Sequence, residues 1–409
     1  MAGSTRKKQP SPTKSLSSMW IAIKLAYRNL VGAGLRTWLT VLVLSFSFVV
    51  IIWMKGVMVG WDHQAKTDMT HYEIGGGQYW HEAYDPYDPM SLYDSHKPIP
   101  PEVKDDMERG DLEPALIIQG NIFPQGRMMP ALLQGIRPDQ TLFRLPSQSL
   151  DTLTDAIPAF IGAMMAGSSR LKVGDRVTIR WRDAHGTFDA AEILIAAIFH
   201  SNVPTAEASK VYLPLDRLWD MSQLHGQATL LTFRDSQADR PEIPGWILKP
   251  KGELTQQVDE LIKTKSVGQT VLYAVLLLLA MLAIFDTQVL SIFRRQKEIG
   301  TYIALGYTRK EVVGLFTVEG SMHAVLAALV GAAYGLPFLA WQARVGWTMP
   351  IDASQFGMAI AQTLYPVYSA GLVVTTVLIV TLTTALVSYL PSRRIAKMNP
   401  TEALRGKLQ

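Results

Sequence analysis

The sequence contains no cysteine and little charge for its length. Without cysteine the chain has neither a disulfide framework nor a thiolate metal site. Only 18% of the 409 residues are Asp, Glu, Lys or Arg, whereas 48% are hydrophobic. This balance is too apolar for an ordinary soluble enzyme of this length, so it indicates a membrane protein.

The motifs of common catalytic sites are also missing. The sequence has no His-Glu-x-x-His zinc motif and no Gly-x-Ser-x-Gly nucleophile elbow. The glycine-rich stretch at 75–80 is not followed by Lys-Ser or Lys-Thr, so we find no phosphate-binding loop. His63, His71 and His81 match no common zinc spacing. We therefore expect no enzyme activity, no catalytic residue, no metal and no cofactor in this chain, and no nucleic-acid partner.

Four long apolar stretches are present instead. Each has the roughly 20 mostly apolar residues that are needed to cross a bilayer core of about 30 Å. Lys and Arg gather before the first stretch, between the second and third, and after the fourth, whereas the loop between the third and fourth carries only Arg344. Because short loops rich in these residues stay in the cytoplasm, we expect both termini to be cytoplasmic.

The long segment between the first and second stretches is then extracytoplasmic. It holds strand-like runs bounded by Gly, Pro and Asp, at 115–123, 176–183, 191–199, 210–215 and 228–234. Helical pieces are expected near 102–108 and 215–224. The predicted fold class is an α+β membrane protein, with four transmembrane helices and a large mixed α/β extracytoplasmic domain between helices 1 and 2.

Within that domain, the stretch YWHEAYDPYDPMSLYD at 79–94 has no period and reads as a loop. Its aromatic side chains either bind a ligand or pack on their own domain, and the sequence leaves both readings open.

The predicted organisation has nine parts. These are a basic cytoplasmic segment with an amphipathic helix (1–36), helix 1 (37–60), the periplasmic domain (61–266), helix 2 (267–293), a cytoplasmic loop (294–311), helix 3 (312–341), a short outer loop (342–363), helix 4 (364–390) and a cytoplasmic tail (391–409).

The loop between helices 2 and 3 reads as a short helix, a turn at Gly306 and a fresh helix. Thr308, followed three residues later by Glu311, predicts a capping box at the start of that second helix. Ile299 and Ile303 fall on one face of the short helix. This apolar stripe needs a cover, which is either the membrane surface or a soluble partner.

The stretch 294–335, RRQKEIGTYIALGYTRKEVVGLFTVEGSMHAVLAALVGAAYG, resembles the FtsX/MacB-type ABC-transporter permeases. The tail at 391–405 and the opening segment at 23–48 resemble the two ends of the same family. Tyr307-Thr308 replaces the family's usual Ala-Ser. The residues that match the pattern are Glu298, Gly300, Ala304, Leu305, Gly306, Arg309, Glu319 and Gly320.

The resemblance implies a coupling helix that docks on a separate ABC ATPase, in an assembly of two ATPases and two permeases. The second permease is another copy of this chain or a paralogue, and ATP and Mg are bound by the partner ATPase. The location implied is the bacterial inner membrane. The residues assigned to docking are Glu298, Ile299, Gly300, Ile303, Ala304, Leu305, Gly306 and Arg309.

The layout is similar to the lipoprotein-releasing LolC/LolE branch, in which the segment at 158–179 also has a counterpart. That branch implies extraction of a lipoprotein or another amphiphile from the outer leaflet, with membrane lipid, cargo lipoprotein or a periplasmic carrier as partners. The alternative is a mechanotransmitting permease that activates a periplasmic cell-wall enzyme and moves no cargo.

Two further sets of residues stand out in the spans. Asp286 and Glu319 lie near the inner face, where we expect each to pair with a basic residue and Glu319 to brace the coupling helix. Asp286 has a second, directly functional reading. An acyl-chain groove is expected at the outer halves of helices 1 and 2, formed by Trp53, Met54, Val57 and Tyr273.

Overall fold

The computed structural model describes residues 35–152, 154–235, 240–348 and 363–397. The predicted N-terminal amphipathic helix and the end of the tail lie outside these residues. The chain divides into two compact units. The helical unit comprises residues up to 60, 264–347 and 365 onward, and the β-rich unit comprises 61–263 with 348–364.

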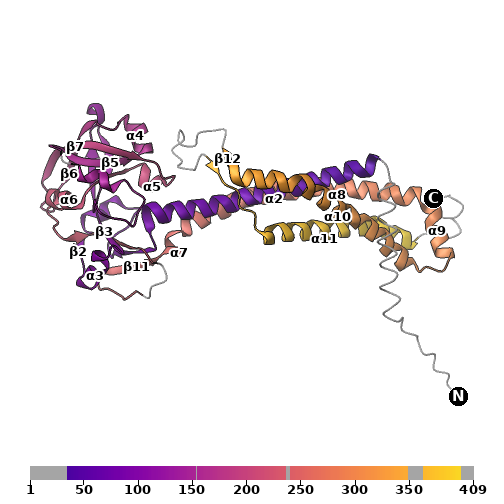
Figure 1. The fold of residues 1–409 in the computed structure, drawn as a ribbon. Helices are drawn as coiled ribbons and strands as arrows, with labels where there is room; N and C mark the ends of the chain where they lie inside the picture. Colours follow the sequence, from indigo (N-terminus) through magenta and orange to yellow (C-terminus); the bar gives the residue numbers. More distant parts are fainter. Residues whose placement is uncertain (1–34, 153, 236–239, 349–362, 398–409) are drawn as a thin grey trace, which may run out of the picture. The chain divides into compact units, whose positions relative to one another are not determined.

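Long helices dominate the helical unit, where they run alongside one another (Figure 1). They are α2 (Leu35–Met69), α8 (Gln256–Arg294), α10 (Arg309–Val345) and α11 (Ala370–Ser392). Among the described residues, these four helices are long and apolar enough to cross a membrane. Four spans were predicted, and four are confirmed.

Small residues let these helices approach closely. In the shared core, Ala324 and Ala327 of α10 meet Leu44 of α2 and Ile284 of α8. A Cβ atom added to Gly331 of α10 would lie 3.3 Å from the main-chain oxygen of a residue in α2. In lipid, where burying apolar surface brings little gain, such close packing is what holds helices together.

The fourth helix begins later than the predicted start at 364. Leu364 instead belongs to a two-residue strand, β13 (Thr363–Leu364), which pairs with β12 (Trp347–Thr348). Pro366 disfavours helical geometry in the residue before it. Ser369 then caps α11, because its side chain accepts a hydrogen bond from the amide of Leu372 at 3.1 Å.

A closed six-stranded barrel forms the centre of the β-rich unit. Its strands are β3 (Leu112–Ile122), β4 (Met129–Ile136), β8 (Lys210–Pro214), β5 (Ile157–Gly162), β7 (Phe188–Phe199) and β6 (Arg176–Arg182). The order is β3-β4-β8-β5-β7-β6, and β6 pairs back onto β3. The β4–β8 and β5–β7 pairs are parallel, and the other pairs are antiparallel. Closure removes the exposed edges of the sheet.

Three strands extend the sheet beyond β3, in the order β10-β1-β11. They are β10 (Leu230–Phe233), β1 (Gly77–His81) and β11 (Trp246–Pro250). The stretch at 79–94, read from the sequence as a loop, therefore begins inside a strand. Buried aliphatic side chains fill the barrel, including Leu133, Ile161 and Ile179, each fully buried.

Short elements connect these strands. They are η1 (Thr70–Ile74), η2 (Pro89–Tyr93), β2 (Lys97–Pro98), η3 (Pro101–Val103), α3 (Lys104–Glu108), η4 (Pro124–Gly126), η5 (Ser147–Asp151), α4 (Ala163–Ser169), α5 (Pro204–Glu207), α6 (Leu215–Ser222), β9 (Gln227–Ala228) and α7 (Lys251–Leu254). The helical unit also holds α9 (Gln296–Ala304) and η7 (Arg393–Lys397). The predicted fold class, four spans with a mixed α/β domain between the first two, is confirmed.

Candidate functional site: a coupling segment and a cavity

The segment between α8 and α10 has the predicted helix–turn–helix form. Helix α9 ends at Ala304, and Gly306 then adopts a φ of 96°, a conformation that suits glycine. Thr308 and Glu311 form the predicted capping box. The Thr308 hydroxyl accepts from the Glu311 amide at 3.3 Å, and the Glu311 carboxylate accepts from the Thr308 amide at 2.8 Å.

The apolar stripe of α9 is covered by the chain itself. Ile299 is fully buried against Ile292, Phe316 and Ile395, which come from α8, α10 and η7. Ile303 is only partly buried at the edge of this cluster. The expectation that the membrane or a partner covers the stripe is therefore wrong for Ile299, because neighbouring helices of the same chain pack on it.

The other face of α9 and the turn after it are exposed. Leu305 has 72% of its surface accessible although it is apolar. The remaining exposed residues assigned to docking are Glu298, Ala304, Gly306 and Arg309. Gly300 is buried. The eight residues assigned to docking thus separate into an exposed set and an inward set, and only the exposed set is placed to contact another protein directly.

Arg295 links α9 to the start of α10. Its guanidinium donates to the Glu298 carboxylate at 2.7 Å and to the Glu319 carboxylate at 2.6 Å. It also lies over the Phe316 ring, 4.9 Å from the centroid. Burial disfavours the charged guanidinium, but the carboxylates of Glu319 and Glu298 outweigh burial and raise the pKa of Arg295. Glu319 therefore forms an ion pair with a basic residue, as the sequence predicts. The sequence did not indicate that Arg295 would contact both Glu298 and Glu319, beyond placing it in the basic pair 294–295.

Asp286 lies on α8 with its side chain exposed. The residues expected to form an acyl-chain groove have different surroundings from one another. Trp53 packs edge-on against Trp347, with ring centroids 5.9 Å apart. Tyr273 lies beneath the ammonium group of Lys55, which is 5.9 Å from the ring centroid.

Val57 is buried and Met54 is half-buried. An apolar groove does lie between α2 and α8, with a volume of about 350 Å³, but at other residues: Leu42, Val43, Phe46, Leu276 and Leu279. The role of the four predicted groove residues stays a prediction.

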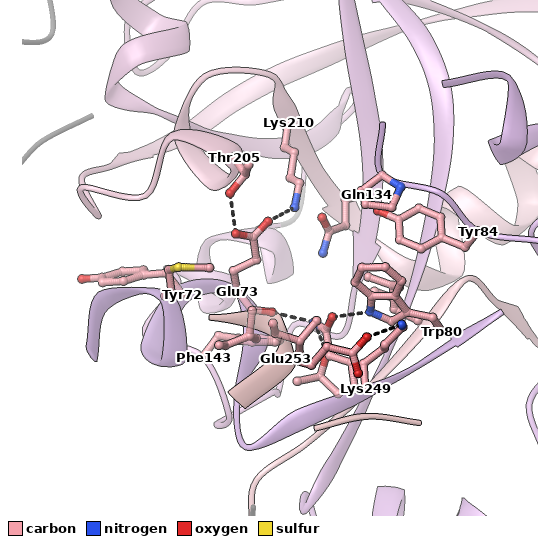
Figure 2. Close-up of a pocket in the computed structure, with 18 of the residues that line it drawn as sticks. Tyr72, Glu73, Trp80, Tyr84, Gln134, Phe143, Thr205, Lys210, Lys249 and Glu253 are labelled. Carbon is pink, nitrogen blue, oxygen red and sulfur yellow. Dashed lines mark hydrogen bonds and ion pairs between the residues drawn. The ribbon is translucent and has the colours of Figure 1, made fainter. Parts of the chain in front are cut away.

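A second hollow, of about 490 Å³, lies in the β-rich unit. Figure 2 shows Glu73 reaching Thr205 and Lys210 across it, with the Lys210 ammonium 2.9 Å from the carboxylate. Trp80 and Tyr84 also line the hollow, and their rings meet edge to face at 5.1 Å. Burial raises the pKa of the Tyr84 hydroxyl well above its usual range. The aromatic segment 79–94, for which the sequence left ligand binding open, supplies Trp80, Tyr84 and Tyr87 to the lining, whereas the rest of the lining had no sequence signal.

Comparison with known protein families finds a match over most of the helical unit. A family model described as the FtsX-like permease C-terminal domain matches residues 270–400. Over these residues the chain is similar to the FtsX-like permeases. The matched residues include the segment between α8 and α10 that we predict to be the coupling segment (294–311), and two complete spans, α10 and α11. With four candidate spans, the FtsX-like chain is a multi-pass membrane protein.

Curated relatives are more distant. The chain is 27% identical over 161 residues to a macrolide export ATP-binding/permease protein MacB of Burkholderia cenocepacia, covering 38% of this chain and 21% of the relative. It is 27% identical over 163 residues to the MacB of Chromobacterium violaceum, covering 38% and 23%. The chain thus spans about a fifth of the length of these curated relatives, and their ATP-binding region lies outside the match.

Proposed function

We propose that this FtsX-like chain is the permease subunit of an ABC transporter and is driven by a separate ATPase subunit. The observation that carries the proposal is the coupling segment. One face of α9 and the leucine after it are exposed, while the opposite face is buried against the rest of the helical unit. Leu305 is 72% exposed, whereas Ile299 of the same segment is fully buried. Tyr307, two residues after Leu305, is also exposed, at 48%. Exposed apolar side chains that gather on one surface mark interaction sites. ATP and Mg are then bound by the partner.

The buried part of the segment supplies a route for force. A push on the exposed face of α9 reaches α10 through the Arg295–Glu319 ion pair and through the packing of Ile299 on Phe316. The ion pair is partly buried and the Ile299–Phe316 contact is fully buried, so the two contacts tie α9 to α10 at two points. Movement of α9 is therefore expected to move α10, which crosses the membrane.

We further propose that the cargo is a lipoprotein or another amphiphile, extracted from the outer leaflet of the bacterial inner membrane. The apolar groove between α2 and α8 supports an acyl-bearing cargo, because Val43, Phe46 and Leu279 are exposed side chains that suit acyl chains. It lies near the middle of the two spans, so it bears on the chemistry of the cargo and not on the leaflet from which the cargo comes. The basic segments predict both termini in the cytoplasm and the β-rich unit outside. A second permease copy or paralogue completes the assembly, and a periplasmic carrier or cargo lipoprotein meets the β-rich unit.

The alternative function is mechanotransmission, in which ATP hydrolysis changes the β-rich unit and activates a periplasmic cell-wall enzyme without moving cargo. This function would use the same coupling segment to receive force from the ATPase. In transport the membrane spans contact cargo during ATP turnover, whereas in mechanotransmission they do not.

Purification of the tagged chain from its native membrane tests the shared core of both functions. We expect an ATPase subunit with a phosphate-binding loop to co-purify and to hydrolyse ATP. Recovery of a stable permease without any ATPase, from cells that express both, would contradict the proposal.

Photocrosslinking then separates transport from signalling. A photoreactive amino acid at Phe46 in the groove should capture a lipidated species or another amphiphile during ATP turnover. The same probe at Leu382 is the control, since this side chain is 68% exposed on α11 and lies outside the groove. Equal capture at both positions would show only lipid contact. No cargo at Phe46, together with an ATP-dependent change in proteolysis of the β-rich unit, would favour mechanotransmission.

A further inference from the structure

The hollow in the β-rich unit has the size and lining of a small-molecule site. Its volume of about 490 Å³ falls in the range of roughly 300–1,000 Å³ that such sites occupy. Every residue that lines it belongs to the β-rich unit, so it is distinct from the groove between α2 and α8.

Gln134 provides an unsatisfied amide inside this hollow. It lies on β4, is only 7% exposed, and its side-chain oxygen is buried without a hydrogen-bond partner in the part of the chain that the structure describes. Figure 2 shows its amide on the wall of the hollow. Buried polar atoms nearly always have a hydrogen-bond partner, because an atom without one loses its hydrogen bonds to water and gains none in the protein. A ligand that donates to this oxygen would remove that cost.

Aromatic side chains form the sides of the hollow. In Figure 2, Tyr72 and Phe143 lie on one side, and Trp80 and Tyr84 lie on the other. Tyr87 also lines the hollow and is 72% exposed. The faces of aromatic rings carry partial negative charge, and they attract the C–H groups on the flat face of a saturated ring, which carry partial positive charge.

Four of the five charged side chains that line the hollow form two ion pairs, and the fifth, Glu260, is exposed. Lys210 is bound to Glu73, and Lys249 is bound to Glu253 (Figure 2). The Lys249 ammonium also lies 5.7 Å from the centroid of the Trp80 ring, so a cationic ligand would have to displace it. The ligand favoured by this lining is therefore uncharged, with an apolar ring face and hydroxyl groups at its rim.

We propose that this hollow binds a sugar ring of a neutral glycan. The flat face of the ring lies against the aromatic side chains. Two neighbouring hydroxyls meet the Gln134 amide, one donating to its oxygen and the other accepting from its nitrogen. The glutamate carboxylates accept further hydroxyl donors. This binding site goes beyond the permease function and does not depend on an ATPase.

Calorimetric titration of the purified full chain with chitotriose and with maltotriose tests the proposal. Gln134→Leu removes both amide hydrogen bonds at nearly constant volume, and we expect at least about tenfold weaker binding. Gln119→Leu is the matched control. Its amide oxygen accepts from the Tyr93 hydroxyl at 3.0 Å and lies outside the lining of the hollow, so sugar affinity should be unchanged.

A second variant keeps the test valid if Gln134→Leu does not fold. Tyr87→Ala changes an exposed side chain, and we expect binding to weaken by about threefold to tenfold. The proposal is overturned if neither trisaccharide binds the wild-type chain, or if Tyr87→Ala and a folded Gln134→Leu both bind as the wild type does. Binding of trialanine that is lost in Gln134→Leu, with both sugars silent, would instead assign the hollow to peptides.

Discussion

The exposed leucine after α9 gives the most direct test of ATPase docking. In Leu305→Asp a carboxylate replaces an apolar side chain that is 72% exposed in the permease alone. Because the side chain makes little contact within the chain, the free energy of unfolding should change by no more than about 0.5 kcal/mol. Docking on a partner would bury this position, and there the carboxylate would lose its water without gaining a partner.

The expected loss of binding is much larger than the loss of stability. Truncation of an apolar anchor at the centre of an interface costs about 2 kcal/mol or more, which corresponds to roughly thirtyfold weaker binding. The buried carboxylate adds to that cost. The variant should therefore remain folded in the membrane while it loses its ATPase.

Affinity of the permease for its ATPase is measured in nanodiscs, and thermal unfolding is measured on the same samples. Val173→Asp is the matched control, because Val173 is 60% exposed in the β-rich unit, away from the coupling segment. If Leu305→Asp binds the ATPase as tightly as Val173→Asp does, Leu305 is not part of the docking surface and the reasoning from exposure fails.

Three further outcomes are expected from the packing of the helical unit. Ile299→Ala empties a fully buried position and should lower the free energy of unfolding by about 2–5 kcal/mol in chemical denaturation; a loss below about 0.5 kcal/mol would contradict the packing described for α9. Glu319→Gln removes the charge that holds Arg295 at 2.6 Å, so ATPase binding should persist while hydrolysis no longer drives cargo release or the external change; full coupling in this variant would exclude the brace. Gly331→Leu places a side chain against Ser45 of α2 and should cost about 1–3 kcal/mol, whereas Gly314→Leu on the same helix enters open space and should not; equal melting temperatures for the two variants would count against the close approach of α10 and α2.

Much of the fold follows from local patterns in the sequence. The four spans, the capping box at Thr308 and the five strand-like runs are all present. Two strands of the barrel that the sequence did not reveal, β4 and β5, contain proline, which usually breaks strands. Pro130 and Pro158 each precede the residues at which their strands pair with β8, so on that side no ladder hydrogen bond is lost.

Barrel closure was not predictable in the same way. It depends on the pairing of β3 with β6, in which Gly120 faces Trp181. The pattern of either strand alone shows that it has buried positions, but it does not show which partner strand it meets.

The candidate site shows a similar limit. The spacing of Ile299 and Ile303 correctly identifies an apolar face on α9, but periodicity does not say what covers that face. Gln134 gave no signal, because a glutamine in a strand is ordinary until its surroundings are known. The hollow that it lines is assembled from several strands and short helices that are far apart in sequence.

The pairing of β1 with β11 has a consequence for biosynthesis. Gly77 lies opposite Pro250, so the first and last strands, in chain order, of the nine-stranded sheet are neighbours in one ladder. Nearly the whole segment must be synthesised before that ladder can form, and until then β1 has an open edge. Until the ladder forms, the segment is therefore vulnerable to proteases and to aggregation. Once closed, it has adjacent ends, so it suits transfer as a cassette between two helices of another membrane protein.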